Sequence, residues 1–105
     1  MVINYNEEER ILHIKLTEEI DHHTTEVIRR RSDYEIQKYI PEKVIFDFKT
    51  VTFMDSAGIG LIIGRYKLIS MLGGMLEIEN VSSSVEKILK MSGLLKIIKI
   101  CVTES

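Results

Sequence analysis

The chain has 105 residues, of which 45% are hydrophobic and 29% charged, and its formal net charge is −2. This composition is typical of one folded globular domain, residues 1–105, and excludes a disordered chain. The slightly negative charge also argues against nucleic acid as a partner, because such binding depends on neutralising phosphates.

The cellular setting is predicted from the scarcity of cysteine, long apolar stretches and targeting signals. Cys101 is the one cysteine, which excludes an intramolecular disulfide and favours a reducing compartment. Apolar stretches are shorter than the roughly 20 residues of a membrane helix, and residues 1–5 lack the features of a signal peptide. We therefore expect a cytoplasmic protein that does not enter a membrane.

The chain is expected to open with a β-hairpin. Residues 2–6 form a weak strand, and residues 12–16 alternate apolar and polar side chains with the period of a half-buried strand. Asn6 and the three glutamates after it are typical of the turn between them.

A helix is expected to begin at Asp21 and to end before Pro41, since proline disfavours helical geometry in the residue before it. Its inward face is marked at spacings of three and four by Ile28, Ser32, Ile36 and Tyr39. Residues 29–31 are all arginine and point in different directions, which indicates a solvated surface rather than one patch.

A central strand and a second helix follow. Residues 44–48 are a continuous apolar run, which predicts a strand buried on both faces. Residues 50–54 connect it to a helix over residues 56–71, which Gly73 and Gly74 close.

The last third predicts a strand, a helix and a final short strand. Residues 75–79 alternate as a strand does, and a helix runs from the serines at 82–84 to Ser92 and Gly93. That helix is expected to turn inward Val85, Ile88, Leu89 and Met91. Residues 97–102 make the last strand, with Cys101 as a small buried hydrophobe. The order β-β-α-β-α-β-α-β predicts an α/β fold with a mixed sheet.

The most informative stretch is residues 53–61, where a short loop is predicted to deliver Ser56 to the N-cap of the second helix. A serine there lies beside free backbone N–H groups and the positive end of the helix dipole, which suits an anion. It can equally be only a cap. Gly58, Gly60 and Gly64 each cost a helix about 1 kcal/mol, which indicates close approach by another element or by a partner.

Four kinds of catalytic or binding site are excluded on detail. The glycine-rich turn lacks the lysine of a phosphate-binding loop, and Ile63 replaces the third glycine of a dinucleotide motif. Ala57 breaks the serine-hydrolase elbow pattern. His22 and His23 lack further ligands, so we expect no metal site, no cofactor and no enzymatic activity.

Residues 53–60 resemble the phosphorylation-site signature of STAS-domain anti-sigma factor antagonists, and the match continues through residues 64–67. Residues 16–24 and 91–98 are similar to two further segments of that family, in the same order and spacing. The His22–His23 pair and the Gly-Arg-Tyr-Lys tetrapeptide point to the sporulation branch, which acts on the anti-sigma-F factor. A general stress-response antagonist, or a STAS scaffold module of a stress-signalling assembly, is the alternative.

The resemblance implies partner switching. The unphosphorylated protein, a monomer when free, would bind an anti-sigma factor that is also a serine kinase and so release the sigma factor. That kinase would phosphorylate Ser56 with its own bound ATP, and a PP2C-type phosphatase would reverse the step. Asp21 matches an acidic family residue expected to contact the kinase, and a helix cap is the other interpretation. The predicted partner-binding residues are Asp21, Met54, Asp55, Gly58, Ile59, Gly60, Ile63, Arg65 and Tyr66.

Overall fold

The computed structural model describes residues 1–102, and the order of its elements confirms the predicted α/β pattern. The elements are β1 (Val2–Asn6), β2 (Ile11–Lys15), α1 (Thr25–Tyr39), β3 (Lys43–Asp47), α2 (Ser56–Met71), β4 (Met75–Val81), α3 (Ser83–Met91), the 3-10 helix η1 (Leu94–Lys96) and β5 (Lys99–Val102). No helix in this part of the chain is long and apolar enough to span a membrane.

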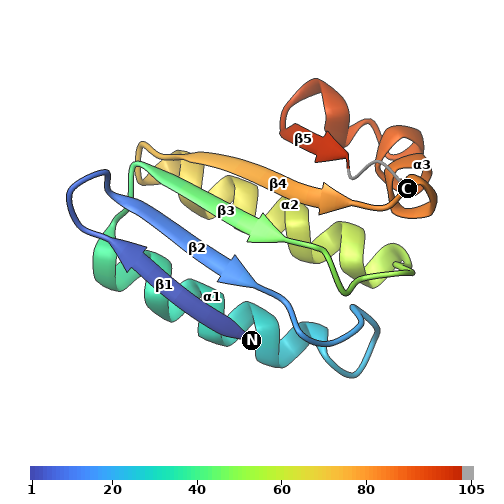
Figure 1. Cartoon of the computed structure of the whole chain (residues 1–105), viewed down its shortest axis with the longest axis horizontal. Helices are drawn as coiled ribbons and strands as arrows, with labels where there is room; N and C mark the ends of the chain where they lie inside the picture. The colour runs from blue at the N-terminus through green and yellow to red at the C-terminus, as the bar shows by residue number, and fades with distance from the viewer. Residues whose placement is uncertain (103–105) are drawn as a thin grey trace.

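The five strands form one mixed sheet in the order β1-β2-β3-β4-β5 (Figure 1). β1 pairs antiparallel with β2, as the hairpin predicts, and every other pair is parallel. Parallel strands place their carboxyl ends at one edge of a sheet. The loops after β2 and β3 therefore leave the sheet at the same end, and the candidate site lies there.

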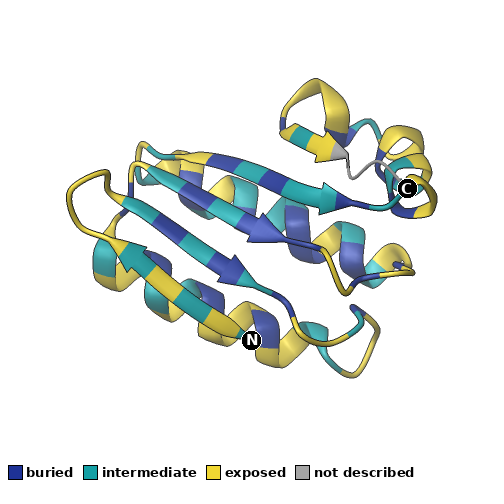
Figure 2. Ribbon diagram, in the orientation of Figure 1, coloured by how far each residue is buried: buried dark blue, intermediate teal, exposed yellow. Residues whose placement is uncertain are grey.

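Helices α1 and α2 cover one face of the sheet, and burial along the strands alternates accordingly (Figures 1 and 2). The inward residues of β2, β3 and β4 are buried in the core: Leu12, Ile14, Val44, Phe46, Leu76 and Ile78. On the opposite face, Ile45 and the residues of β2 are half-buried, and Asp47 at the end of β3 is buried. The prediction that β3 is buried on both faces is therefore wrong, because the described elements pack helices against one face only.

α1 confirms its predicted face and its end but begins later than expected. Ile28, Ser32 and Ile36 are buried, and residues 29–31 are exposed. The helix ends at Tyr39, and Ile40 adopts left-handed backbone geometry before Pro41. Its first residue is Thr25 rather than Asp21, because residues 21–24 form a separate turn ahead of it.

The C-terminal elements differ from their predictions at three positions. In α3, Val85 and Leu89 are buried as expected, whereas Met91 is 89% exposed at the last helical residue. β5 begins at Lys99, because the chain before it is wound into η1. Cys101 is exposed rather than buried, since β5 is an edge strand with one neighbour.

Candidate phosphorylation and partner-binding site

Ser56 is the first residue of α2, and Asp55, not Ser56, is its N-cap. The Asp55 carboxylate accepts hydrogen bonds from the backbone N–H groups of Ala57 at 3.0 Å and Gly58 at 3.3 Å. The prediction that Ser56 caps the helix is therefore wrong. Because the aspartate performs this role, the exposed Ser56 hydroxyl makes no hydrogen bond within residues 1–102.

The loop before α2 is fastened to the loop after β2. The Glu19 carboxylate accepts hydrogen bonds from the backbone N–H of Thr52 at 2.9 Å and of Phe53 at 3.1 Å. Ile20 and Met54 form a parallel bridge between the two loops. Two segments separated by about thirty residues in sequence are thus held side by side at the end of the sheet.

Asp21 lies on the same rim as Asp55. These two carboxylates, with Glu19, Ile20 and Phe53, line a shallow depression of about 120 Å³. Backbone N–H groups of Thr24 and, to a lesser extent, His23 hold the pKa of Asp21 below its ordinary value. Asp21 therefore closes the turn over residues 21–24, and its exposed carboxylate adds negative charge to the rim that Asp55 shares.

The glycines of α2 serve different purposes. A Cβ placed on Gly58 would lie 2.1 Å from Met54 Cγ, so this glycine permits the close packing of Met54 under the helix. A Cβ on Gly60 or Gly64 would meet nothing within 4 Å. The close approach predicted within the domain therefore holds for Gly58 alone, and the other two leave open surface.

That open surface is a groove between the first halves of α1 and α2, with a volume of about 350 Å³. Its floor is built of small residues of α2, and charged side chains of α1 stand at its wall. The lining residues are Thr25, Glu26, Arg29, Ala57, Gly60, Leu61, Gly64 and Arg65. The groove begins at Ala57, the residue that follows Ser56.

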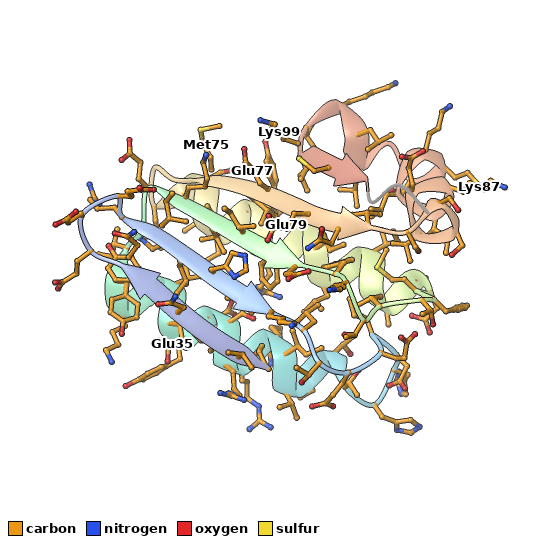
Figure 3. All side chains as sticks on the ribbon, in the orientation of Figure 1. Glu35, Met75, Glu77, Glu79, Lys87 and Lys99 are labelled. Atoms are coloured by element: carbon orange, nitrogen blue, oxygen red, sulfur yellow. The ribbon has the colours of Figure 1, made fainter. Side chains whose placement is uncertain are left out.

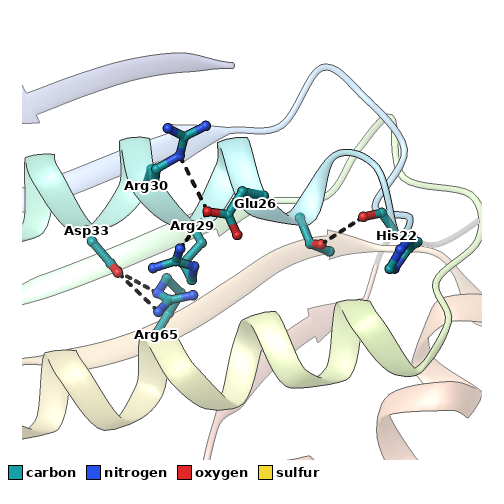
Figure 4. Close-up of polar contacts among 7 residues, drawn as sticks. His22, Glu26, Arg29, Arg30, Asp33 and Arg65 are labelled. Atoms are coloured by element: carbon teal, nitrogen blue, oxygen red, sulfur yellow. Dashed lines mark hydrogen bonds and ion pairs between the residues drawn. The ribbon is translucent and has the colours of Figure 1, made fainter.

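Arg65 joins the two helices below this groove (Figure 4). Its Nε lies 2.6 Å from Oδ1 of Asp33, and its Nη2 donates a hydrogen bond to Oδ2 at 3.2 Å. Nη1 also donates to the backbone carbonyl of Leu61. Burial lowers the pKa of Arg65, and the Asp33 carboxylate opposes that shift. Arg65 is 6% exposed, so this pair fixes the spacing of α1 and α2.

The structure places the predicted partner-binding residues in two groups. Asp21, Asp55 and Gly60 are exposed, and Ile59, Ile63 and Tyr66 are half-buried. The remaining three are buried: Met54, Gly58 and Arg65. The buried three lie beneath the surface that the others form.

Sequence reasoning did not find three residues that build this end of the molecule. Glu19 ties the two loops together, Arg29 walls the groove, and Asp33 holds Arg65. Glu19 and Asp33 belong to no recognisable motif. Their partners lie more than thirty residues away in the sequence, so only the folded structure shows what they contact. Arg29 belongs to the arginine run predicted to be solvated, and it pairs with Glu26 on the surface of α1.

Comparisons with known proteins identify the family. A model of the STAS domain matches residues 2–105. The chain is 42% identical over 90 residues to the anti-sigma F factor antagonist of Paenibacillus polymyxa, covering 86% of this chain and 77% of that protein. The chain therefore belongs to the STAS-domain anti-sigma factor antagonist family.

Two solved structures show the same fold. The unphosphorylated form of the anti-sigma factor antagonist SpoIIAA superposes with a TM-score of 0.76 at 32% identity, covering 88% of this chain and 80% of that one. The phosphorylated form of SpoIIAA from Bacillus, described as a cell fate determinant, gives a TM-score of 0.68 at 30% identity and covers 88% and 83%. The resemblance seen in the motifs thus extends to the fold.

Proposed function

We propose that this protein is an anti-sigma factor antagonist of sporulation that acts by partner switching in the cytoplasm. Its unphosphorylated form, a monomer when free, binds an anti-sigma factor that is also a serine kinase, and the sigma factor is released. Phosphorylation of Ser56 ends that binding, and a PP2C-type phosphatase restores it. The chain is a substrate and a binding module, and it catalyses neither step.

The observation that carries this proposal is the state of Ser56. Its hydroxyl is exposed, has no hydrogen bond within residues 1–102, and stands at the first residue of a 16-residue helix. The kinase supplies ATP, and Ser56 Oγ takes the γ-phosphoryl group, loses its proton and leaves ADP. Because Asp55 already caps the helix, α2 does not depend on the Ser56 hydroxyl being free.

Phosphate at Ser56 acts on an interface more strongly than on the fold. It adds about −1.5 to −2 charges to a rim that already holds Asp21 and Asp55. In the free protein, water and the helix dipole accommodate this charge. Buried against a partner without a matching cation, it costs several kcal/mol, and each 1.4 kcal/mol is a tenfold loss of affinity.

The binding surface we propose is built of the six accessible members of the predicted set. Asp21 and Asp55 provide negative charge for a basic residue of the kinase, and Gly60 with Ile59 provides close, apolar contact. Ile63 and Tyr66 extend this surface along α2. Met54, Gly58 and Arg65 act as positioning residues, since each is buried beneath that surface.

The test is binding and phosphorylation with purified anti-sigma-F kinase. In isothermal titration with ADP present, Ser56→Ala is expected to bind as tightly as the wild type, and Ser56→Asp about a hundredfold more weakly. With ATP and magnesium, intact mass should rise by about 80 Da, one phosphoryl group, in the wild type and not in Ser56→Ala.

Ser70→Asp is the matched control, because Ser70 is an exposed serine in the last turn of the same helix. It should bind the kinase like the wild type. Equal affinity of the wild type and Ser56→Asp would overturn the switch. If the protein binds only the kinase of the general stress response, the partner-switching mechanism still holds. The protein is then a general stress-response antagonist rather than a sporulation one.

A further inference from the structure

The uncovered face of the sheet carries a cluster of metal-ligating side chains that the Ser56 site does not use. His13 of β2, Asp47 of β3 and Glu79 of β4 come from three adjacent parallel strands. One ligand atom from each lies within 4.8 Å of the other two, and no other such group occurs within residues 1–102. Figure 3 shows Glu79 on the face turned away from the helices. We propose that these three residues bind one zinc ion.

The distances suit a first-row divalent ion. His13 Nε2 and Glu79 Oε1 are 2.6 Å apart. Ligands at zinc's usual 2.0–2.2 Å lie at most about 4.4 Å from one another. His13 and Glu79, which are in hydrogen-bond contact, would therefore move apart by side-chain rotation to admit the ion. An imidazole nitrogen with two carboxylates suits zinc, whereas magnesium and calcium prefer oxygen ligands only.

Asp47 supplies an independent reason to expect a cation. Its side chain is only 7% exposed, yet within the described chain no lysine or arginine forms an ion pair with it. Lys15 is its register neighbour on β2 and remains outside ion-pair distance. Buried carboxylates are ordinarily paired or bound to a metal, so Asp47 is a carboxylate that a bound cation would stabilise.

Asp47 is also held in place as a metal ligand needs to be. Its Oδ1 accepts hydrogen bonds from the Lys49 backbone N–H at 2.9 Å and from Asn80 Nδ2 at 3.0 Å. Asn80 adopts a left-handed backbone, φ 57°, at the irregularity of β4. Such outer contacts orient a ligating carboxylate and leave its second oxygen for the ion.

The geometry leaves room for further ligands from water. The side chains of His13 and Glu79 are 37% and 35% exposed, so the ion would be reached from solvent. Two carboxylates neutralise the charge of a zinc ion, and the ion would take the place of the direct contact between His13 and Glu79. Glu79 lies on the face of the sheet opposite α2 (Figure 3), so this site is independent of the function proposed for Ser56.

Titration of the chelator-treated, reduced protein with zinc chloride at pH 7 tests this assignment. We expect one ion per chain, and at least tenfold weaker binding in Asp47→Asn and in Glu79→Gln. Both variants keep the shape of the side chain and its hydrogen-bond acceptor. Zinc should also shift the His13 imidazole signals in ¹H–¹⁵N spectra, and magnesium at the same concentration should not.

Three controls separate this site from adventitious binding. Glu77→Gln changes a carboxylate on the same strand face that pairs instead with Lys43 and Lys99. The double variant His22→Gln/His23→Gln removes the adjacent histidines, and Cys101→Ser removes the exposed thiol. All three should bind zinc within twofold of the wild type.

Loss of binding in any control, or no binding by the wild type, would overturn the proposal. So would an unchanged affinity in Glu79→Gln. Melting curves recorded in chelator show whether each variant is folded. If Asp47→Asn fails to fold, Glu79→Gln and His13→Asn decide the question, because both positions are half-exposed.

Discussion

At the scale of single residues, Asp55 and Ser56 divide two tasks that one residue was expected to perform. The carboxylate of Asp55 satisfies two free N–H groups of α2, and the hydroxyl of Ser56 is left to solvent. Modification of Ser56 leaves the capping carboxylate of Asp55 in place. The separation therefore allows Ser56 to change its charge while α2 keeps its first turn.

This division predicts different stabilities for two alanine variants. Asp55→Ala should lower the free energy of unfolding by about 1 kcal/mol, because it removes the N-cap. Ser56→Ala should change it by less than about 0.5 kcal/mol, as is usual for exposed positions. Urea unfolding measures both, and Asp55→Asn, which retains a capping oxygen, is the control. If Ser56→Ala lowers the free energy of unfolding more than Asp55→Ala does, Ser56 rather than Asp55 caps the helix.

At the scale of elements, α2 has one glycine packed closely against the domain, Gly58, and two with open space above them, Gly60 and Gly64. Gly58 lies over Met54, which is 1% exposed, and over Ile20. Gly60 lies in the groove against α1. Arg65 and Asp33 keep α1 and α2 at the spacing that leaves this groove between them.

Alanine at these two glycines should therefore act in opposite directions. Gly58→Ala is expected to lower the free energy of unfolding by about 1–3 kcal/mol, because its Cβ overlaps a packed Met54 side chain. Gly60→Ala should raise it by up to about 1 kcal/mol through helix propensity. Denaturant unfolding measures both.

The kinase affinity of the Gly60→Ala variant then separates stability from binding. If Gly60 forms part of the interface, this variant is more stable and binds the kinase less tightly. An unchanged affinity would remove Gly60 from the proposed surface, and a destabilised Gly60→Ala would contradict the open space found above it.

At the scale of the whole molecule, the two candidate sites lie on different sides of one sheet. The loops after β2 and β3 bring Ser56, Asp21 and Asp55 to the carboxyl end of the sheet, beside the helix layer. His13, Asp47 and Glu79 lie on the face that no described helix covers. A charge added at Ser56 is therefore local to one end of the molecule.

We accordingly expect Ser56→Asp to leave the fold intact. Its melting temperature should stay within about 4 °C of the wild type, since the helix dipole offsets repulsion from Asp55 and a change of 1 kcal/mol shifts melting by about 4–8 °C. Changes in ¹H–¹⁵N spectra should be confined to residues 19–25 and 53–61. Changes spread through β1 and α3 would show that the charge acts on the whole fold.

Much of the fold was predictable because the local pattern of apolar and polar residues indicates where helices and strands form. Alternation over residues 12–16 and 75–79 predicted β2 and β4, and Pro41 predicted the end of α1. The errors lie where tertiary packing decides. Ile45 has the same apolar character as its neighbours but faces the uncovered side of the sheet, and Met91 and Cys101 lie at the ends of elements where nothing described covers them.

The sequence alone determined the order of elements, the family, and the position of Ser56 at the start of a helix, because each depends on residues close together in the chain. Tertiary structure decided which oxygen caps that helix, which glycine is packed, and that Glu19 joins two loops. It also decided that His13, Asp47 and Glu79 meet. Their meeting depends on strand order and register, which arise from long-range pairing of the sheet.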